Sequence, residues 1–185
     1  VAHFLLMIEL KVQLILQPGQ RPLRIGIVGQ QRGTDSAADA LAQLTAELIR
    51  IPTTNPPGDH YEACAHFLGE RLQRSGFDVT YLRANGAPGD SDRHPRVNVV
   101  ARYEGPHFAQ GQTLHFNSHI DVVETGPGWT YEPFGGQVAN GRVYGRGTCD
   151  MKGGLASSII AKGIASTNPT MIGEMELGSK CRQMT

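Results

Sequence analysis

The chain has 185 residues, a length typical of one domain, and 39% of them are hydrophobic, which is enough to bury a core. With 17 basic and 17 acidic residues the formal net charge is zero, and no basic stripe with interleaved aromatic residues occurs, so no nucleic-acid partner is expected. No apolar run is long enough to span a bilayer, so no membrane partner is expected either.

The cysteines argue against a disulfide scaffold and against a cysteine-based zinc site. Cys64, Cys149 and Cys181 are odd in number, lie far apart and form no C-x-x-C pair. This usage favours a reducing, cytoplasmic setting. Cys149, which stands beside an aspartate, is interpreted as a buried filler residue and not as a ligand.

Residues 1–34 are predicted to be an N-terminal extension of uncertain order. The opening VAHFLLMIEL lacks a basic region and a small-residue cleavage site, so it does not resemble a signal peptide. Because the chain opens with Val1 and its first methionine is Met7, this stretch is either a true first strand or sequence upstream of the start. The later GIVGQQRG does not match the dinucleotide fingerprint G-x-G-x-x-G.

Two helices follow. Asp35 or Ser36 can cap the first, which runs to about Ile51 and carries one apolar stripe, namely Leu41, Leu44 and Leu48. Asp59, with Glu62 three residues later, resembles a capping box for the second helix. Its apolar face consists of Ala65, Leu68 and Leu72, and Gly76 is the expected stop.

Strand patterns come next, and they set the fold class. Alternation and β-branched residues predict strands over 77–82, 97–103 and 113–119, and Asn140-Gly141 predicts a hairpin turn. A final helix is predicted over 151–165. This order favours an α/β fold with a mixed sheet flanked by helices, in which sites gather beyond the carboxyl ends of strands.

His119 and Asp121 stand at the end of the strand predicted over 113–119. Residues i and i+2 of a strand share a side, so both side chains can point into one space. An imidazole is a good ligand for zinc-type ions, and the carboxylate can either ligate the metal or hold the other ring nitrogen. Alone the H-x-D pair is weak, because a lone histidine at a strand end is usually structural.

Asp150 precedes the last predicted helix, and a plain N-cap is its simplest interpretation. Gly145 and Gly147 flank Arg146, which either steadies this loop or reaches an acidic group. The spacing is not that of a P-loop, and no G-x-S-x-G motif of a serine hydrolase occurs.

Taken together, residues 119–154 form a specific pattern. HIDVVETGPGWTYEPFGGQVANGRVYGRGTCDMKGG contains, in order, H-x-D-V-V, a Gly-Trp pair, a Pro-Phe pair, G-R-x-Y-G-R-G and D-M-K-G. This stretch resembles the acetylornithine deacetylase / succinyl-diaminopimelate desuccinylase family of dinuclear zinc metallopeptidases. The resemblance covers about 35–165, and 35–165 would be the N-terminal portion of a zinc-exopeptidase-like catalytic domain without its lid domain.

The resemblance implies hydrolysis of N-acyl amino acids or small peptides by a metal-activated water, with two Zn²⁺ ions per complete site and Co²⁺ as a possible substitute. His119 would be a ligand to one ion, and Asp150 would bridge the two. Asp121 would be the catalytic carboxylate behind His119, with an unusual cis peptide after it. Full-length relatives would be homodimers.

The same resemblance implies a general-base glutamate downstream, followed by a glutamate ligand, and these are absent from the chain. GEMEL (173–177) looks like the strand that leads to that pair, but Glu174 and Glu176 come too early. Gln183 stands near the expected position of the base, and an amide cannot accept a proton at neutral pH. Residues 166–185 are therefore interpreted as a divergent tail, and the chain alone is expected to be inactive.

Three hypotheses follow from these observations. The first is part of a metal-dependent amidohydrolase whose substrate is a small N-acyl amino acid or peptide. The second is a non-catalytic fragment or pseudoenzyme that binds a partner or a small molecule. The third is a module that binds one metal ion through His119, Asp121 and Asp150.

Overall fold

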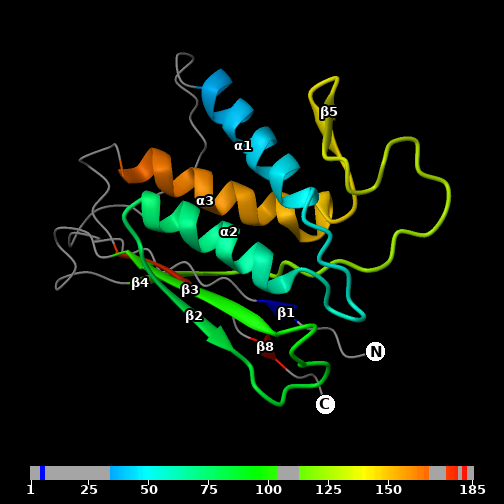
Figure 1. The fold of residues 1–185 in the computed structure, drawn as a ribbon. Helices are drawn as coiled ribbons and strands as arrows, with labels where there is room; N and C mark the ends of the chain where they lie inside the picture. Colours follow the sequence, from blue (N-terminus) through cyan, green and yellow to red (C-terminus); the bar gives the residue numbers. More distant parts are fainter. Residues whose placement is uncertain (1–4, 7–33, 104–112, 167–173, 179–180, 183–185) are drawn as a thin grey trace.

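The structure, a computed structural model, describes residues 5–6, 34–103, 113–166, 174–178 and 181–182. Its centre is a four-stranded sheet below a group of helices (Figure 1). Across the sheet the strands run in the order β2 (Asp78–Arg83), β3 (Val97–Tyr103), β7 (Glu174–Gly178) and β4 (Thr113–Asn117).

The sheet is mixed, as the sequence predicts. β2 pairs antiparallel with β3, β3 pairs antiparallel with β7, and β7 pairs parallel with β4. The strand expected in GEMEL therefore forms, and it lies between β3 and β4. Whether residues 166–185 are a divergent tail stays a prediction, as do the other proposed domain limits.

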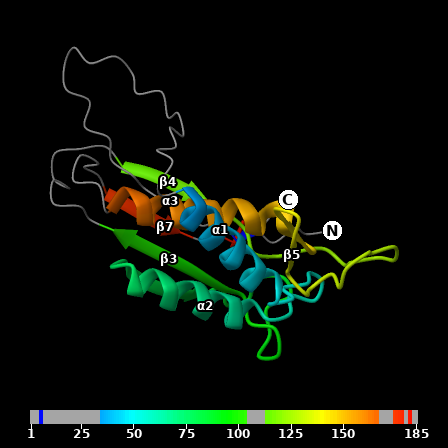
Figure 2. The ribbon, with the colours of Figure 1, turned by 90° about the horizontal axis from the view of Figure 1, so that it is seen from above.

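Three helices lie on the same side of this sheet (Figures 1 and 2). They are α1 (Thr34–Ile49), α2 (Tyr61–Arg74) and α3 (Gly153–Ser166). α2 packs on β2 and β3, and α1 packs on α3. Within the described ranges, none of the helices has the length and apolar character that crossing a membrane requires.

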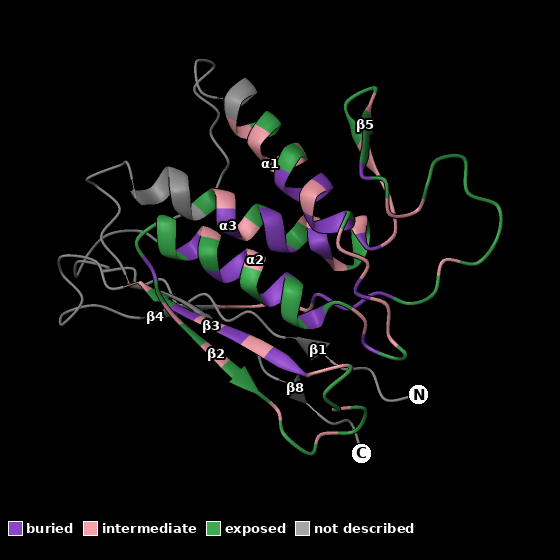
Figure 3. Ribbon diagram, in the orientation of Figure 1, coloured by how far each residue is buried: buried purple, intermediate pink, exposed green. Residues whose placement is uncertain are grey.

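The core lies where these helices meet each other and the sheet (Figure 3). Both predicted helix stripes are confirmed, because their members are buried or pack against the buried cluster. That cluster consists of Leu44, Leu48, Tyr61, Cys64, Ala65, Leu68, Leu72, Phe77, Val97, Val99, Ala101, Ile120, Leu155, Ala156 and Ile159. Burial of this apolar surface is the main favourable contribution to folding.

Helix ends were predicted less well than helix faces. α1 begins at Thr34, so Asp35 and Ser36 lie inside its first turn and not at its cap. α2 begins after His60, whose backbone is left-handed (φ 55°) and whose side chain makes no capping hydrogen bond, so the predicted capping box is wrong.

The predicted end of α2 is confirmed. Gly76 has a φ of 84°, and the amide of Phe77 donates to the carbonyl oxygen of Leu72 over 3.1 Å. This is the Schellman arrangement, in which a left-handed residue lets the chain satisfy the last helical carbonyls.

Two short ribbons complete the structure. β1 (Leu5–Leu6) pairs antiparallel with β8 (Cys181–Arg182). The predicted hairpin is confirmed as β5 (Gln137–Ala139) and β6 (Arg142–Tyr144). Figure 1 shows it beside α1, where Arg50 of the helix end donates to two backbone oxygens just before β5.

Candidate metal centre

His119 lies just beyond the carboxyl end of β4. The strand ends at Asn117, so the strand predicted over 113–119 is two residues too long, and strand alternation is not what pairs His119 with Asp121. Ile120, between them, is fully buried in the core cluster. This anchor holds an irregular segment against the core, and the two neighbouring side chains meet beside it.

The imidazole of His119 contacts one aspartate at each ring nitrogen. Nδ1 hydrogen-bonds to the backbone oxygen of Asp121 over 3.1 Å and lies 3.1 Å from the carboxylate Oδ1 of the same residue. Nε2 lies 2.8 Å from Oδ1 of Asp150. The structure therefore brings together all three residues that the sequence singles out.

A loop between α1 and α2 supports the Asp121 side of this group. The side-chain amide of Asn55 donates to Oδ2 of Asp121 over 3.3 Å, and its backbone amide donates to the oxygen of Val122 over 2.9 Å. The amide of Val122 donates in turn to the oxygen of Thr53 over 2.9 Å. The hydroxyl of Thr53 donates to the oxygen of Ile120. Four hydrogen bonds thus join residues 53–55 to residues 120–122.

Asp150 comes from the other side, in a wide turn called η2 (Thr148–Lys152) that leads into α3. Its backbone is extended (φ −128°, ψ 98°), and α3 begins only at Gly153, so Asp150 is not the N-cap of that helix. The resemblance places a cis peptide after Asp121, and that position is wrong, because the non-proline cis bond joins Asp150 to Met151.

The two sides touch at Gly147, directly before η2. Its φ is 87°, and a Cβ atom there would lie 2.4 Å from Cγ1 of Val122. A side chain is therefore excluded both by the backbone conformation and by the neighbouring methyl group. Glycine lets the chain of η2 approach the His119 segment closely enough for the 2.8 Å contact between His119 and Asp150.

Lys152, the last residue of η2, ties this turn to the end of α1. The side chain is fully buried, and Nζ donates to the backbone oxygens of Leu48 (2.9 Å) and Ile51 (2.7 Å). Burial lowers the pKa of Lys152 to about 8, although the nearby Cys64 and Asp121 oppose that shift. Lysine is almost never fully buried without partners, and the two carbonyl oxygens are its partners here.

Sequence reasoning missed the roles of Asn55 and Lys152. Lys152 stands inside the D-M-K-G part of the motif, and its place next to an apolar helix was the available signal. Asn55 offers only a polar residue in the proline-rich loop TTNPPG, and its contact with Asp121 spans 66 positions of the chain. Cys149 was predicted to be buried and is exposed, because η2 turns it away from the core.

Electrostatics at the centre favour a cation. Burial disfavours a charged imidazole, but the hydrogen bonds and charges of Asp121 and Asp150 outweigh that cost and raise the pKa of His119 to about 9. At neutral pH and without a metal, His119 therefore carries protons on both ring nitrogens. A metal ion that binds Nε2 would take the place of one of these protons.

The donor atoms fit part of a zinc site. Imidazole nitrogen and carboxylate oxygen are ordinary zinc ligands, and Nε2 of His119 and Oδ1 of Asp150 converge while Asp121 holds the opposite ring nitrogen. Within the described ranges no group of three or more histidine, cysteine, aspartate or glutamate side chains could hold a metal ion together. The described residues therefore supply two ligands of a centre.

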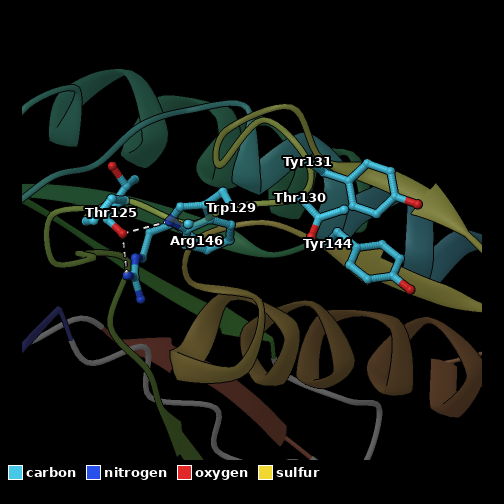
Figure 4. Close-up of a pocket in the computed structure, with 8 residues that line it drawn as sticks. Thr125, Trp129, Thr130, Tyr131, Tyr144 and Arg146 are labelled. Atoms are coloured by element: carbon cyan, nitrogen blue, oxygen red, sulfur yellow. Dashed lines mark hydrogen bonds between the residues drawn. The ribbon is translucent and has the colours of Figure 1, made fainter.

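A separate cavity of about 650 Å³ lies along the loop between the two sides (Figure 4). Its lining is Thr125, Pro127, Gly128, Trp129, Thr130, Tyr131, Tyr144 and Arg146, so His119, Asp121 and Asp150 do not line it. Arg146 lies over the ring of Trp129, 5.2 Å from its centroid, and donates to the backbone oxygen of Thr125 over 3.3 Å. Of the two roles considered for Arg146, the structure supports steadying the loop.

Comparison with known proteins was informative for the segment that carries this centre. Residues 115–168 match the family described as "Peptidase family M20/M25/M40". A succinyl-diaminopimelate desuccinylase of Cereibacter sphaeroides is 40% identical over 121 residues, which are 64% of this chain and 28% of that protein. One of Hahella chejuensis is 35% identical over 130 residues, which are 69% of this chain and 30% of that protein.

The chain thus spans less than a third of the length of these curated relatives, at 28% and 30%. The matched segment includes His119, Asp121 and Asp150, and the resemblance noted in the sequence is confirmed. The chain is therefore similar to the M20/M25/M40 peptidase family over this segment, residues 115–168.

Proposed function

We propose that this chain carries part of the active site of a metal-dependent amidohydrolase that cleaves the amide bond of N-acyl amino acids or small peptides. The observation that carries the proposal is the convergence of Nε2 of His119 and Oδ1 of Asp150 at 2.8 Å, inside the segment that matches the family. The names of the relatives favour an N-succinyl amino acid within this substrate class.

The residues have distinct roles in this proposal. His119 would hold one metal ion through Nε2, and Asp150 has two carboxylate oxygens with which to bridge two ions. Asp121 would keep the remaining proton of the imidazole on Nδ1, so that Nε2 presents its lone pair to the metal. Zinc bound there would act as a Lewis acid toward the amide carbonyl and would lower the pKa of a water molecule.

The test is a zinc titration of the 185-residue chain, followed with a competing chromophoric chelator. Zinc binding is expected to be weak and to disappear in both His119→Ala and Asp150→Asn. An equal zinc affinity in wild type and His119→Ala would overturn the proposal. Stoichiometry separates the hypothesis of a single-ion module, because that module takes one ion where a dinuclear centre takes two.

Activity is the second test. The pure chain is expected not to hydrolyse N-acetylornithine or N-succinyl-diaminopimelate, since the described residues offer only two metal ligands. Zinc-dependent hydrolysis that is lost in His119→Ala would show that this expectation is wrong and that the chain is sufficient for catalysis. A chain that binds neither zinc nor these compounds would favour the non-catalytic alternative.

A further inference from the structure

We propose that Asn55 is a positioning residue of the candidate metal centre. Its side-chain amide fixes the rotation of the Asp121 carboxylate, and that carboxylate fixes the orientation of the His119 ring. The inference rests on the proposed function, because Asn55 would position a metal ligand of the same centre. Its geometric part can be tested without any metal.

The contacts of the Asp121 carboxylate are divided between its two oxygens. Oδ2 accepts a hydrogen bond from Nδ2 of Asn55 over 3.3 Å, and Oδ1 lies 3.1 Å from Nδ1 of His119, which hydrogen-bonds to the backbone oxygen of the same aspartate. Since one oxygen is held from behind, rotation of the carboxylate away from the imidazole would break the bond to Asn55. The side chain of Asp121 is only 11% exposed, so water offers little replacement for that bond.

The backbone gives Asn55 a fixed position from which to act. Its own amide donates to the oxygen of Val122 over 2.9 Å, and Thr54 forms an isolated parallel bridge with Val122. Thr53, on the other side, hydrogen-bonds to the backbone at both Ile120 and Val122. The side chain of Asn55 therefore starts from a backbone that is tied directly to the residues beside Asp121.

Lys152, the buried cation nearby, does not perform this task. Among the described residues, Nζ of Lys152 donates to the backbone oxygens of Leu48 and Ile51 and not to Asp121. Within the part of the chain that the structure describes, Asn55 is thus the side chain that donates to Oδ2 of Asp121, whereas His119 faces Oδ1. A neutral donor suits this place, because it orients the carboxylate and leaves its charge to act on the imidazole.

The first experiment uses metal-free chain and the ¹⁵N resonance of Nδ1 in His119, assigned by its absence in His119→Ala. Asp121→Asn gives the reference change in the chemical shift of Nδ1, since it replaces the carboxylate that faces this nitrogen. Asn55→Leu, which has a similar shape and no donor, is expected to move the resonance by at least about half as far and in the same direction. Asn85→Leu, the same substitution at an exposed loop position, is the matched control and should leave the resonance unchanged.

The second experiment is a double-mutant cycle on zinc affinity. Asn55→Leu is expected to weaken zinc binding by about tenfold, the lower end of what loss of an outer partner of a metal ligand costs. In the Asp121→Asn background the same change should cost less than about twofold, because Asn55 acts through Asp121. Asn55→Asp, which places a second carboxylate against the first, should weaken binding at least as much as Asn55→Leu.

The outcomes separate this proposal from the proposed function. An unmoved Nδ1 resonance in Asn55→Leu, or in Asp121→Asn, overturns the positioning role, as does a cycle in which the two losses simply add. If zinc does not bind at His119 but the resonance moves as expected, the positioning role stands and the metal-dependent function fails. Circular dichroism of each variant checks that the fold is intact.

Discussion

The two sides of the candidate centre are built differently. The His119 side, residues 118–122, has a buried residue at its middle and four hydrogen bonds to residues 53–55, and the side chain of His119 is only 14% exposed. The Asp150 side, residues 147–152, has an irregular backbone, and the side chain of Asp150 is 87% exposed.

This difference means that the His119 side has a fixed geometry, whereas the Asp150 side has a carboxylate available to ligands. The His119 side is fixed by contacts that also stabilise the fold, so its geometry exists before any ligand arrives. Among the described residues, only its own backbone and the His119 ring position the Asp150 carboxylate, and its 87% exposure leaves room for additional partners. A metal centre needs both properties, because rigid ligands set the geometry and exposed carboxylate oxygens accept further ions.

The largest expected effect concerns zinc. His119→Ala and Asp150→Asn should each reduce zinc affinity by at least about a hundredfold, roughly 2.7 kcal/mol, because each removes one of two ligands. The two variants should differ in their effect on the free energy of unfolding, because His119 is nearly buried and Asp150 is exposed. Asp150→Asn should lower it by no more than about 1 kcal/mol, because the exposed carboxylate makes only a solvent-screened contact with the charged His119 ring.

Chelator competition measures the zinc affinities, and urea unfolding of the metal-free variants measures stability. The comparison between the two sides breaks if Asp150→Asn destabilises the chain by several kcal/mol. That result would mean that the Asp150 carboxylate is part of the folded core and not an available ligand.

The next effect tests the link between η2 and α1. Lys152→Met keeps the length of the side chain and removes both hydrogen bonds to the end of α1. Hydrogen bonds to charged groups contribute about 1.5–3 kcal/mol each, and part of this gain is offset by the cost of burying the ammonium, so a net loss of about 2 kcal/mol is expected. Urea unfolding measures it, with Arg74→Met on the exposed face of α2 as the control.

A stability of Lys152→Met equal to that of wild type would contradict this account. It would show that the apolar packing of α3 on α1, and not the buried ammonium, connects the Asp150 side to the rest of the chain. In either case the zinc affinity of the variant indicates whether this connection also sets the distance between His119 and Asp150.

These contacts show where sequence reasoning succeeds and where it stops. The stripes of α1 and α2, the strand over Val97–Tyr103 and the hairpin turn all follow from local periodicity and turn chemistry, which a single stretch of sequence contains. His119, Asp121 and Asp150 were found because the motif over residues 119–154 matches the family pattern at many positions in order.

What the sequence did not contain is the support around those residues. The bond between Asn55 and Asp121 joins positions 66 apart, and the bond between Lys152 and Leu48 joins positions 104 apart. Neither leaves a periodic pattern. The end of β4 was placed two residues too late for a related reason, since residues 120–122 are held by hydrogen bonds to residues 53–55, which are distant in the sequence.

A smaller effect tests the hydrogen bonds of the His119 side. Thr53→Val removes the hydroxyl that donates to the oxygen of Ile120 in a fully buried place, and about 1–2 kcal/mol of stability should be lost. Thr80→Val, at an exposed position of β2, is the matched control and should be neutral or slightly stabilising. If the two variants are equally stable, the hydrogen bonds to residues 53–55 do not hold the His119 side.

The next prediction concerns the pH dependence of zinc binding, whose free energy should change by about 1.4 kcal/mol per pH unit. Because the pKa of His119 is raised to about 9, zinc must displace a proton from it throughout the neutral range. The apparent zinc affinity should therefore rise about tenfold per pH unit between pH 6.5 and 8. An affinity that levels off above pH 6.5 would mean that the two aspartates do not hold the imidazole as a cation.

The last prediction compares the reactivity of two thiols, one beside Asp150 and one in the core. Cys149, beside Asp150, is exposed, whereas Cys64 is buried in the core, where burial raises its pKa to about 11 even though the charge of Lys152 opposes that shift. In a Cys181→Ser background at pH 8, iodoacetamide should label Cys149 at least about a hundredfold faster than Cys64, since only a thiolate in contact with solvent reacts. Urea should remove the difference in labelling rate.

Equal labelling rates in the folded chain would contradict this prediction in one of two ways, and the labelling rate of Cys64 decides which. Slow labelling at both sites would place η2 inside the protected structure, whereas fast labelling at both would show that burial of Cys64 does not last on the timescale of the reaction.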